Sequence, residues 1–461
     1  MEESCERDSA TSPAVVRWTR GKIGHLLVTV FLYCFSNLIV VPAITDVTIS
    51  ALCPGDPDGS CSLAIYLSGF QQAIIGLGTV VMTPWVGNMS DKHGRKALLT
   101  LPLAFSIVPL AIMAYNRETN YFYAYFAVRT LTAMVGTDAV TCLAVAYLAD
   151  NVPETQRIST FSILYGVISA GFVGSTLAAR FISTSLTFQV AAFMSMVTVV
   201  YMRIFLEDSH PEADEISRPI LNGSDALDVD ADGGGSAKKA HAFKKVVSLG
   251  DIFGLMRSSR TFSLAAFVAF CNNIAEGGLQ ASLLYFLKAR FHFSKNQFAD
   301  LMLIVGVAGT LSQLIIMPFL APLLGEERLL SIGLLLGSSH MFLYSISWSS
   351  WVPYATTVFA IFVVFVSPCI RSIASKQVGP FDQGKAQGCL AGISSFANIV
   401  SPLIFSPLTA MFLSEKAPFP FPGFSIMCMG VVMMIGFVQS LAIKPSATNH
   451  KEICNESSAQ P

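Results

Sequence analysis

The chain has 461 residues, of which 53% are hydrophobic and only 13% are charged, and its formal net charge at pH 7 is −1. Soluble proteins carry roughly 25% charged residues, so this composition excludes an ordinary soluble protein and predicts lipid as the surrounding solvent. The near-zero net charge averages over the two faces of a membrane and by itself favours no partner.

Apolar runs of about 20 residues recur along the chain, and each is long enough to cross a hydrocarbon layer about 30 Å thick. These runs do not alternate in polarity as the strands of a membrane barrel do. We therefore predict an all-α polytopic membrane protein. Its twelve transmembrane helices are expected at residues 23–45, 64–86, 97–115, 121–148, 159–182, 185–206, 262–287, 297–320, 329–347, 352–374, 388–413 and 424–443.

The first of these helices, 23–45, is too long for the core of a signal peptide, and no small-residue cleavage site precedes the next loop. We expect it to stay in the membrane. With both termini in the cytoplasm, about 21 of the 29 Lys and Arg residues lie in cytoplasmic segments, in agreement with the positive-inside rule. No targeting motif stands out, so the plasma membrane and an endomembrane such as the vacuole fit equally.

Two cysteines differ from the others in their surroundings. Cys53 and Cys61 are the first and last residues of the stretch CPGDPDGSC in the first outer loop. Most of the other cysteines lie in apolar helices, where a free cysteine behaves as a small hydrophobic side chain. On an oxidising outer side the two loop cysteines can form a disulfide. The alternative is a pair of unbonded loop thiols.

The turn between the second and third predicted helices reads GNMSDKHGRK, residues 87–96. A hairpin this tight favours glycine at both corners, Gly87 for close approach to a neighbouring helix and Gly94 for a turn with few steric limits. Asp91 can then face the N-terminus of another helix, where unpaired amides and the helix dipole favour an anion. The alternative is a cytoplasmic loop that merely collects basic residues.

The order of residues in this turn resembles the loop signature of the major facilitator superfamily, and the matching positions are Gly87, Asp91, Gly94, Arg95 and Lys96. The resemblance implies a fold of two six-helix bundles related by pseudo-symmetry. It also implies that Asp91 clasps the N-terminus of the eleventh helix, near Gly388, and closes a cytoplasmic gate in the outward-open state.

Two further segments, RTLTAMVG (129–136) and AVAYLADNVPETQR (144–157), resemble the branch that contains tetracycline exporters and hippocampus-abundant-transcript-like proteins. The matching residues are Arg129, Gly136, Ala149, Asp150 and Arg157. This likeness implies that Arg95 pairs with Asp150 at the cytoplasmic end of the fourth helix, and that Arg129 takes part in proton coupling. The alternative for Arg129 is a structural pair or a side chain that snorkels to the outer interface.

A polar stretch separates the two sets of six predicted helices. Its composition cannot bury enough apolar surface to order itself, although LGDIFGLMRSSR near its end can lie flat on the membrane. Aligning FSNLIVVP with CNNIAEGG pairs Asn37 with Asn273, and aligning TPWV with MPFL gives nearly the same offset, which is weak evidence for a duplicated bundle. The expected regions are a cytoplasmic tail (1–22), an N-terminal bundle (23–206), a cytoplasmic linker (207–260), a C-terminal bundle (261–443) and a second cytoplasmic tail (444–461).

Ionisable residues inside the predicted helices need a reason, because a charge at the bilayer centre costs roughly 2.5–3.5 kcal/mol on insertion scales. Asp138 lies nine residues after Arg129, about 900° around a helix and hence on the opposite face. The tetracycline exporters that this segment resembles usually carry a small neutral residue where Asp138 stands. It is therefore either a substrate or proton group or a buried partner for a neighbouring helix.

Glu276 lies near the middle of the seventh predicted helix, in CNNIAEGGLQAS. Asn272, Asn273 and Gln280 fall on the same face at spacings of three and four residues. The predicted substrate or proton site comprises these four residues together with Arg129, Asp138 and Asn37. Burial disfavours the charged form of a carboxylate, so Glu276 can exchange one proton per transport cycle. The alternative is a hydrogen-bond network that holds helices together.

Other polar residues in the second half allow two interpretations each. Arg371 either snorkels or holds the inner gate. Gln313, Ser394, Ser395 and Asn398 either line the cavity or bond neighbouring helices.

We predict a secondary active transporter that moves a small organic solute by alternating access and is coupled to protons. The expected partners are a small-molecule substrate, protons and the lipid bilayer, with no nucleic acid, and we expect a monomer. The alternative is a non-transporting sensor or scaffold that retains the fold. No metal-ligand cluster, phosphate-binding loop or nucleophile motif is present, so we expect neither an enzyme nor a metal or cofactor.

Overall fold

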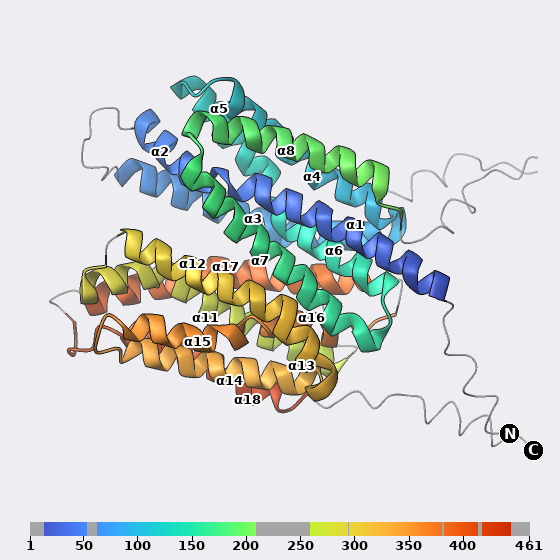
Figure 1. Cartoon of the computed structure of the whole chain (residues 1–461). Helices are drawn as coiled ribbons and strands as arrows, with labels where there is room; N and C mark the ends of the chain where they lie inside the picture. Colours follow the sequence, from blue (N-terminus) through green and yellow to red (C-terminus); the bar gives the residue numbers. More distant parts are fainter. Residues whose placement is uncertain are drawn as a thin grey trace, which may run out of the picture.

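The computed structural model describes residues 13–52, 62–208, 259–293, 295–379, 382–413 and 417–443. Over these ranges the chain is helical and contains no strand. Figure 1 shows the long helices running side by side, with those of the first half of the sequence above those of the second half. Cys53, Cys61 and most of the predicted linker lie outside the described residues.

The helices of the first half are α1 (Pro13–Leu38), α2 (Val40–Leu52), α3 (Ser62–His93), α4 (Arg95–Tyr115), α5 (Thr119–Ala133), α6 (Thr137–Asn151), the short η1 (Glu154–Gln156), α7 (Arg157–Phe181) and α8 (Thr184–Phe205). The helices of the second half are α11 (Arg260–Phe291), α12 (Lys295–Leu311), the π-helical turn η2 (Ser312–Ile316), α13 (Met317–Leu324), α14 (Glu326–Ser345), α15 (Val352–Val363), α16 (Val366–Ser375), α17 (Gln383–Leu413) and α18 (Phe424–Ser440). Each predicted transmembrane helix coincides with one of these helices or with pieces that continue one another.

Four predicted helices are interrupted, which hydropathy alone did not indicate. The helix expected at 121–148 is α5 followed by α6, because the backbone leaves the helical conformation at Gly136, with φ −89° and ψ −117°. The helix expected at 297–320 contains the π turn η2 just before Pro318, whose ring displaces the carbonyl one turn earlier and which has no amide to donate. Shorter breaks separate α1 from α2 and α15 from α16.

Nine helical stretches in the described residues are long and apolar enough, by length and composition, to cross a membrane, and α18 is a shorter apolar helix. That all twelve predicted helices cross it stays a prediction. Large apolar side chains also face outward at helical spacing. Phe70, Leu77 and Val81 of α3 are 62% to 68% exposed, and a stripe of this kind on a soluble protein would drive association. The chain is an integral membrane protein.

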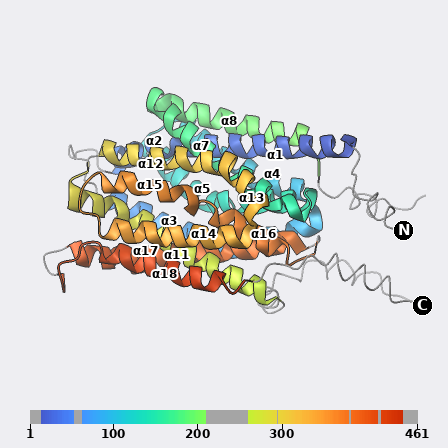
Figure 2. The ribbon, with the colours of Figure 1, turned by 60° about the horizontal axis from the view of Figure 1, so that its bottom comes forward.

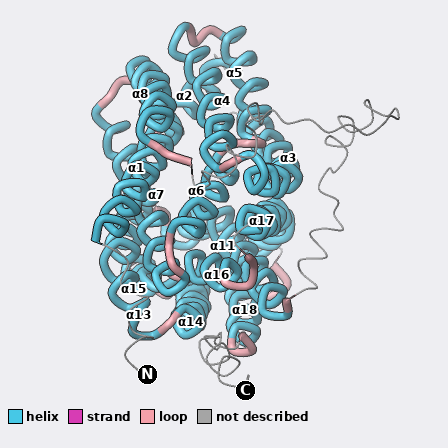
Figure 3. Tube along the Cα trace, turned by 90° about the vertical axis from the view of Figure 1, so that its right-hand side faces the viewer, coloured by secondary structure: helices cyan, strands magenta, loops and turns pink. Residues whose placement is uncertain are grey.

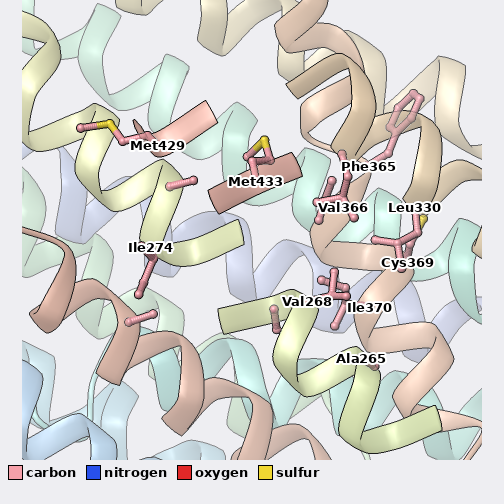
Figure 4. Packing of buried hydrophobic residues seen from close by; sticks show 14 of the residues in the cluster. Ala265, Val268, Ile274, Leu330, Phe365, Val366, Cys369, Ile370, Met429 and Met433 are labelled. Atoms are coloured by element: carbon pink, nitrogen blue, oxygen red, sulfur yellow. The ribbon is translucent and has the colours of Figure 1, made fainter. Parts of the chain in front are cut away.

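Buried apolar side chains form separate cores in the two halves. Two clusters belong to the first half, and one large cluster belongs almost entirely to the second. Figure 4 shows part of the large cluster, in which Val268 of α11 lies near Ile370 of α16, and to which Ile274 of α11 and Met433 of α18 also belong. Because lipid is as apolar as these side chains, close packing rather than exclusion of water holds such helices together.

The two halves meet along α3, α6 and α7 from the first half and α12, α13, α16 and α17 from the second. Figure 3 looks along the helices and shows α3 beside α17, with α6, α11 and α16 near the middle of the molecule. Figure 2 brings the second half forward, with α17 and α18 along one edge and α1 and α8 along the other. We call the end of the molecule at which α3 ends and α17 begins the latch end.

Candidate functional site

At the latch end, Asp91 of the first half bonds to the backbone of the second half. Its two carboxylate oxygens accept hydrogen bonds from the amides of Gly384 and Lys385, each over 2.9 Å. These amides belong to the first turn of α17, which begins at Gln383, and amides there have no acceptor within their own helix. The helix dipole adds to the attraction for an anion.

The start of this helix differs from the expectation. The sequence placed it near Gly388, whereas α17 begins at Gln383 and Asp91 reaches Gly384 and Lys385 instead. Hydropathy marks only the apolar run, but the polar first turn of α17 is helical as well. This turn extends α17 past the predicted apolar run and toward Asp91.

Arg95 is the first residue of α4, and only 1% of it is exposed. Its Nε donates to a carboxylate oxygen of Asp150 over 2.9 Å, and its guanidinium also forms an ion pair with Asp91. Burial raises the pKa of the Asp91 carboxyl above its ordinary value, while Arg95 and the two amides of α17 act in the opposite direction. The ionised form of Asp91 therefore depends on these partners.

The two glycines of this turn have different geometric roles. A Cβ atom on Gly87 would overlap the carbonyl oxygen of Gly384, so the absence of a side chain lets α3 and α17 approach each other. Gly94 separates α3 from α4 with φ 87°, a conformation in which a side chain is strained.

Asp208, which follows α8, was not among the predicted site residues. Its Oδ1 accepts a hydrogen bond from the Arg95 amide over 3.1 Å and lies 3.5 Å from the amide of Lys96. It therefore places an acid at the N-terminus of α4, where unpaired amides need an acceptor. No sequence pattern pointed to this contact, because 113 positions separate Asp208 from Arg95.

Arg157 makes a second bond between the halves at the same end. Its guanidinium donates to the carbonyl oxygen of Ala149 in α6 over 3.1 Å and to that of Ser375 in α16 over 3.2 Å. Ala149 and Ser375 lie in the last turns of their helices, where carbonyl groups lack intrahelical donors and the dipole favours a cation. Asp91 and Arg157, with the backbone groups of the second half that they reach, are called the latch below.

A cavity of about 200 Å³ lies between the halves. The first half contributes α6 and α7 to its wall, and the second half contributes α11, α16 and α17. The lining residues are Asp138, Thr141, Tyr165, Ile168, Ala269, Asn273, Ser367, Ile370, Arg371, Leu390, Ala391, Ser394 and Asn398.

Two residues of opposite charge line this cavity. Asp138 of α6 accepts a hydrogen bond from the Ser395 hydroxyl of α17 over 2.8 Å, and this bond joins the two halves. Arg371 of α16 donates to the side-chain oxygen of Gln387 over 3.1 Å, and the Tyr165 hydroxyl lies beside it. Neither charge forms an ion pair with another described residue.

Asn273 also lines the cavity, and its amide donates to the Ser394 hydroxyl over 3.1 Å. The other polar residues predicted on this face of α11 lie elsewhere. Glu276 is partly buried beside Asn272, and Gln280 is exposed, but none of the three is among the cavity-lining residues.

Arg129 and Asn37, both predicted site residues, meet each other away from the cavity. The Arg129 guanidinium donates to the side-chain oxygen of Asn37 over 3.2 Å. This contact joins α5 to α1 within the first half. The pairing of Asn37 with Asn273 in the repeat alignment therefore does not give them equivalent surroundings.

Three polar residues of the cavity wall were absent from the predicted set. Thr141 lies three residues after Asp138, so helical spacing from that acid gave a signal for it. Tyr165 and Ser367 lie in apolar helices and carried no comparable signal. Among the described residues no group of three or more His, Cys, Asp and Glu side chains could hold a metal ion.

The sequence of this chain is similar to those of proteins from one family. The model of the Major Facilitator Superfamily matches residues 26–402. The human hippocampus abundant transcript 1 protein is 24% identical over 77% of this chain and 68% of its own length. The class E tetracycline resistance protein of Escherichia coli is 22% identical over 73% of this chain and 77% of its own length.

Solved structures show the same fold. The human organic anion transporter MFSD10 (TETRAN) superposes with a TM-score of 0.73 at 17% identity, and the match covers 93% of this chain and 100% of that one. The fucose:proton symporter FucP of E. coli superposes with a TM-score of 0.59 at 14% identity, over 92% of this chain and 98% of that one. The chain belongs to the major facilitator superfamily, a family of transporters rather than of enzymes.

Proposed function

We propose that this protein is a secondary active transporter that moves a small organic solute through the cavity by alternating access. The observation that carries the proposal is the cavity's position between two halves that bond to each other at the latch. If the halves rock about the cavity, breaking the latch opens it at the latch end, and forming the latch leaves it accessible only from the opposite end.

The bonds of the latch are of a kind that suits a reversible contact. Asp91 and Arg157 bond across the halves to backbone groups at helix ends, which remain polar and can bind water when the halves separate. The latch end is the cytoplasmic end in this proposal, since the basic turn 87–96 and both chain termini belong there by the positive-inside rule.

Proton coupling is part of the same proposal. Asp138 lines the cavity and bonds to Ser395 of the other half, so its protonation would weaken a contact between the halves. Glu276 lies on α11 one turn beyond Asn273 and is the second candidate to carry a proton. A proton that moves through 100 mV gains about 2.3 kcal/mol, which is enough to drive accumulation roughly fiftyfold.

Access to the cavity from each side tests the proposal without knowledge of the substrate. Ser394→Cys places a thiol in the cavity wall, and a membrane-impermeant maleimide is applied to one side of oriented proteoliposomes at a time. We expect modification from the side opposite the latch, and a gain of modification from the latch side in Asp91→Asn. Protein without the added cysteine corrects for native thiols.

Asp382→Asn is the matched control, because Asp382 is an exposed acid just before α17. This variant should leave the rates of maleimide modification from both sides unchanged. Modification from one side only, at the same rate in Asp91→Asn as in the parent, would contradict alternating access. That result would favour the alternative of a non-transporting sensor or scaffold that retains the fold.

A further inference from the structure

The cavity holds one negative and one positive side chain, and they come from different halves. Asp138 belongs to α6 in the first half, and Arg371 belongs to α16 in the second. Both are only partly buried, as expected for side chains that border an open space. The cavity wall is therefore neutral in sum but has two charged positions on opposite halves.

The contacts of both charges are with neutral groups. Asp138 accepts from a serine hydroxyl, and Arg371 donates to a glutamine amide oxygen. Such contacts orient a charged side chain without neutralising it. A charge inside a membrane protein is costly unless an opposite charge is near, so each of the two remains able to bind an ion of the opposite sign.

The charge of a solute determines how many of the two charged side chains it can compensate. A neutral solute compensates neither side chain, and a solute with one charge compensates one and leaves the other. A solute that carries both an ammonium group and a carboxylate can compensate both at once. Discrimination of this kind arises because an unpaired charge left in the site counts against the wrong ligand.

The rest of the wall limits the size and polarity of the solute. A volume of about 200 Å³ lies below the roughly 300–1,000 Å³ of pockets for drug-sized ligands. The uncharged polar groups are hydroxyls and amides, and the apolar groups are Ile168, Ile370 and Leu390 together with two alanines. This mixture suits a compact polar head with a short apolar part.

We propose that the cavity binds a small zwitterion of the amino-acid class, with its ammonium group toward Asp138 and its carboxylate toward Arg371. This inference rests on the proposed function in taking the cavity as the substrate site. It goes beyond that function by naming the class of solute. Because the two charged side chains belong to different halves, the bound zwitterion also bridges the halves. It therefore favours the state in which Asp138 and Arg371 contact the solute at the same time.

Equilibrium binding to the purified full-length protein in nanodiscs tests the class of solute. The probes are phenylalanine, 2-phenylethylamine and 3-phenylpropionate, which share one ring and carry both charges, the ammonium alone and the carboxylate alone. The other proteinogenic amino acids and glycine betaine complete the panel, so that the size of the side chain does not decide the result. We expect at least one zwitterion to bind, and to bind about tenfold or more tightly than its singly charged analogues.

Two variants assign the charges. Asp138→Asn should abolish the preference for the zwitterion over its carboxylate-only analogue, and Arg371→Gln should abolish the preference over its amine-only analogue. The matched controls are Asp300→Asn and Arg180→Gln, which remove one negative and one positive charge elsewhere. These two residues form an ion pair over 3.6 Å, and their side chains are about half exposed. Both controls should keep the parental preferences.

The wild-type panel decides the question even where a variant fails to fold. Absence of binding by every zwitterion, or binding of a singly charged analogue as tight as that of its zwitterion, would overturn the proposal. Cavity access measured with Ser394→Cys needs no ligand, so it separates the two proposals. Access that alternates without zwitterion binding refutes the solute class alone, and zwitterion binding without alternating access refutes transport alone.

Discussion

Arg157 joins the carbonyl ends of two helices that belong to different halves, through Ala149 and Ser375. Hydrogen bonds to a charged group are worth about 1.5–3 kcal/mol each. The residue identity came from a resemblance in the sequence, but its bonding partners did not, because Ser375 lies 218 positions away. Local spacing can indicate that a charge is present and cannot indicate which distant backbone group it reaches.

Arg157→Gln should weaken the latch, because the shorter neutral side chain cannot reach both carbonyl groups. A loss of about 1.5–3 kcal/mol in the latched state corresponds to a shift of tenfold or more toward the unlatched state. The modification rate of Ser394→Cys from the latch side measures this shift. Glu154→Gln is the control, since Glu154 is 61% exposed and lies 3.8 Å from Arg157, and an unchanged rate in Arg157→Gln would contradict the assignment.

Gly87→Ala should also open the latch end, for a steric reason. The added Cβ would meet the carbonyl oxygen of Gly384 only while α3 and α17 are in contact. Gly24→Ala is the matched control, because Gly24 is likewise helical and no other atom lies within 4 Å of its added Cβ. Faster modification of Ser394→Cys from the latch side is expected for Gly87→Ala alone, and equal rates in the two variants would count against close packing of α3 on α17.

At the level of helices, the two halves share a turn geometry that their sequences conceal. Gly94 and Gly325 both have positive φ, 87° and 79°, and precede α4 and α14. The first residue of each helix is buried and paired with the end of another helix, but the charges are reversed. Arg95 pairs with Asp150 in the first half, whereas Glu326 pairs with Lys376 in the second.

The equivalent segment of the second half, APLLGEERL (321–329), keeps little of the loop signature, and this reversal of charge explains why. Glu326 and Glu327 follow Gly325 where Arg95 and Lys96 follow Gly94, yet the segment forms a turn and a buried ion pair of the same kind. The helix positions were predictable because long apolar runs determine them. The breaks at Gly136 and before Pro318 were not, because they depend on single residues within otherwise continuous apolar segments.

Lys376→Gln should destabilise the protein, because it leaves the Glu326 carboxylate buried without its cation. Breaking a buried pair costs about 3–5 kcal/mol, and less is expected here because 20% of the Lys376 side chain is exposed. Thermal unfolding in nanodiscs measures the loss. The exchanged pair Glu326→Lys with Lys376→Glu should recover part of it, and no recovery would contradict an electrostatic origin.

The same variant has a pH dependence with a defined sign. Burial raises the pKa of the Glu326 carboxyl above its ordinary value, and Lys376 opposes the shift. Without Lys376 the pKa rises further, so the folded state binds the proton more readily than the unfolded state does. The deficit in unfolding temperature should therefore be largest above that raised pKa and shrink as the pH falls through it. A deficit that grows on acidification would contradict this account.

At the level of the whole molecule, the two halves have largely separate cores and meet along an interface that combines small residues, bonds to helix ends and a polar cavity. The two-bundle architecture followed from the recurrence of apolar runs and from the loop signature. The cavity did not, because its wall combines residues from five helices whose relative rotation the sequence does not reveal. Asp138 and Asn273 were predicted for it, whereas Glu276 and Arg129 carried the same kind of signal and lie elsewhere.

The most direct test of rocking halves is to measure distances at both ends of one sample by pulsed electron resonance. Spin labels at Lys92 and Arg328 report on the latch end, and labels at Arg117 and Ser350 report on the opposite end; all four residues are exposed. We predict that Asp91→Asn lengthens the latch-end distance and shortens the opposite one. Distances that stay the same in the variant, or that change in the same direction at both ends, would contradict the account.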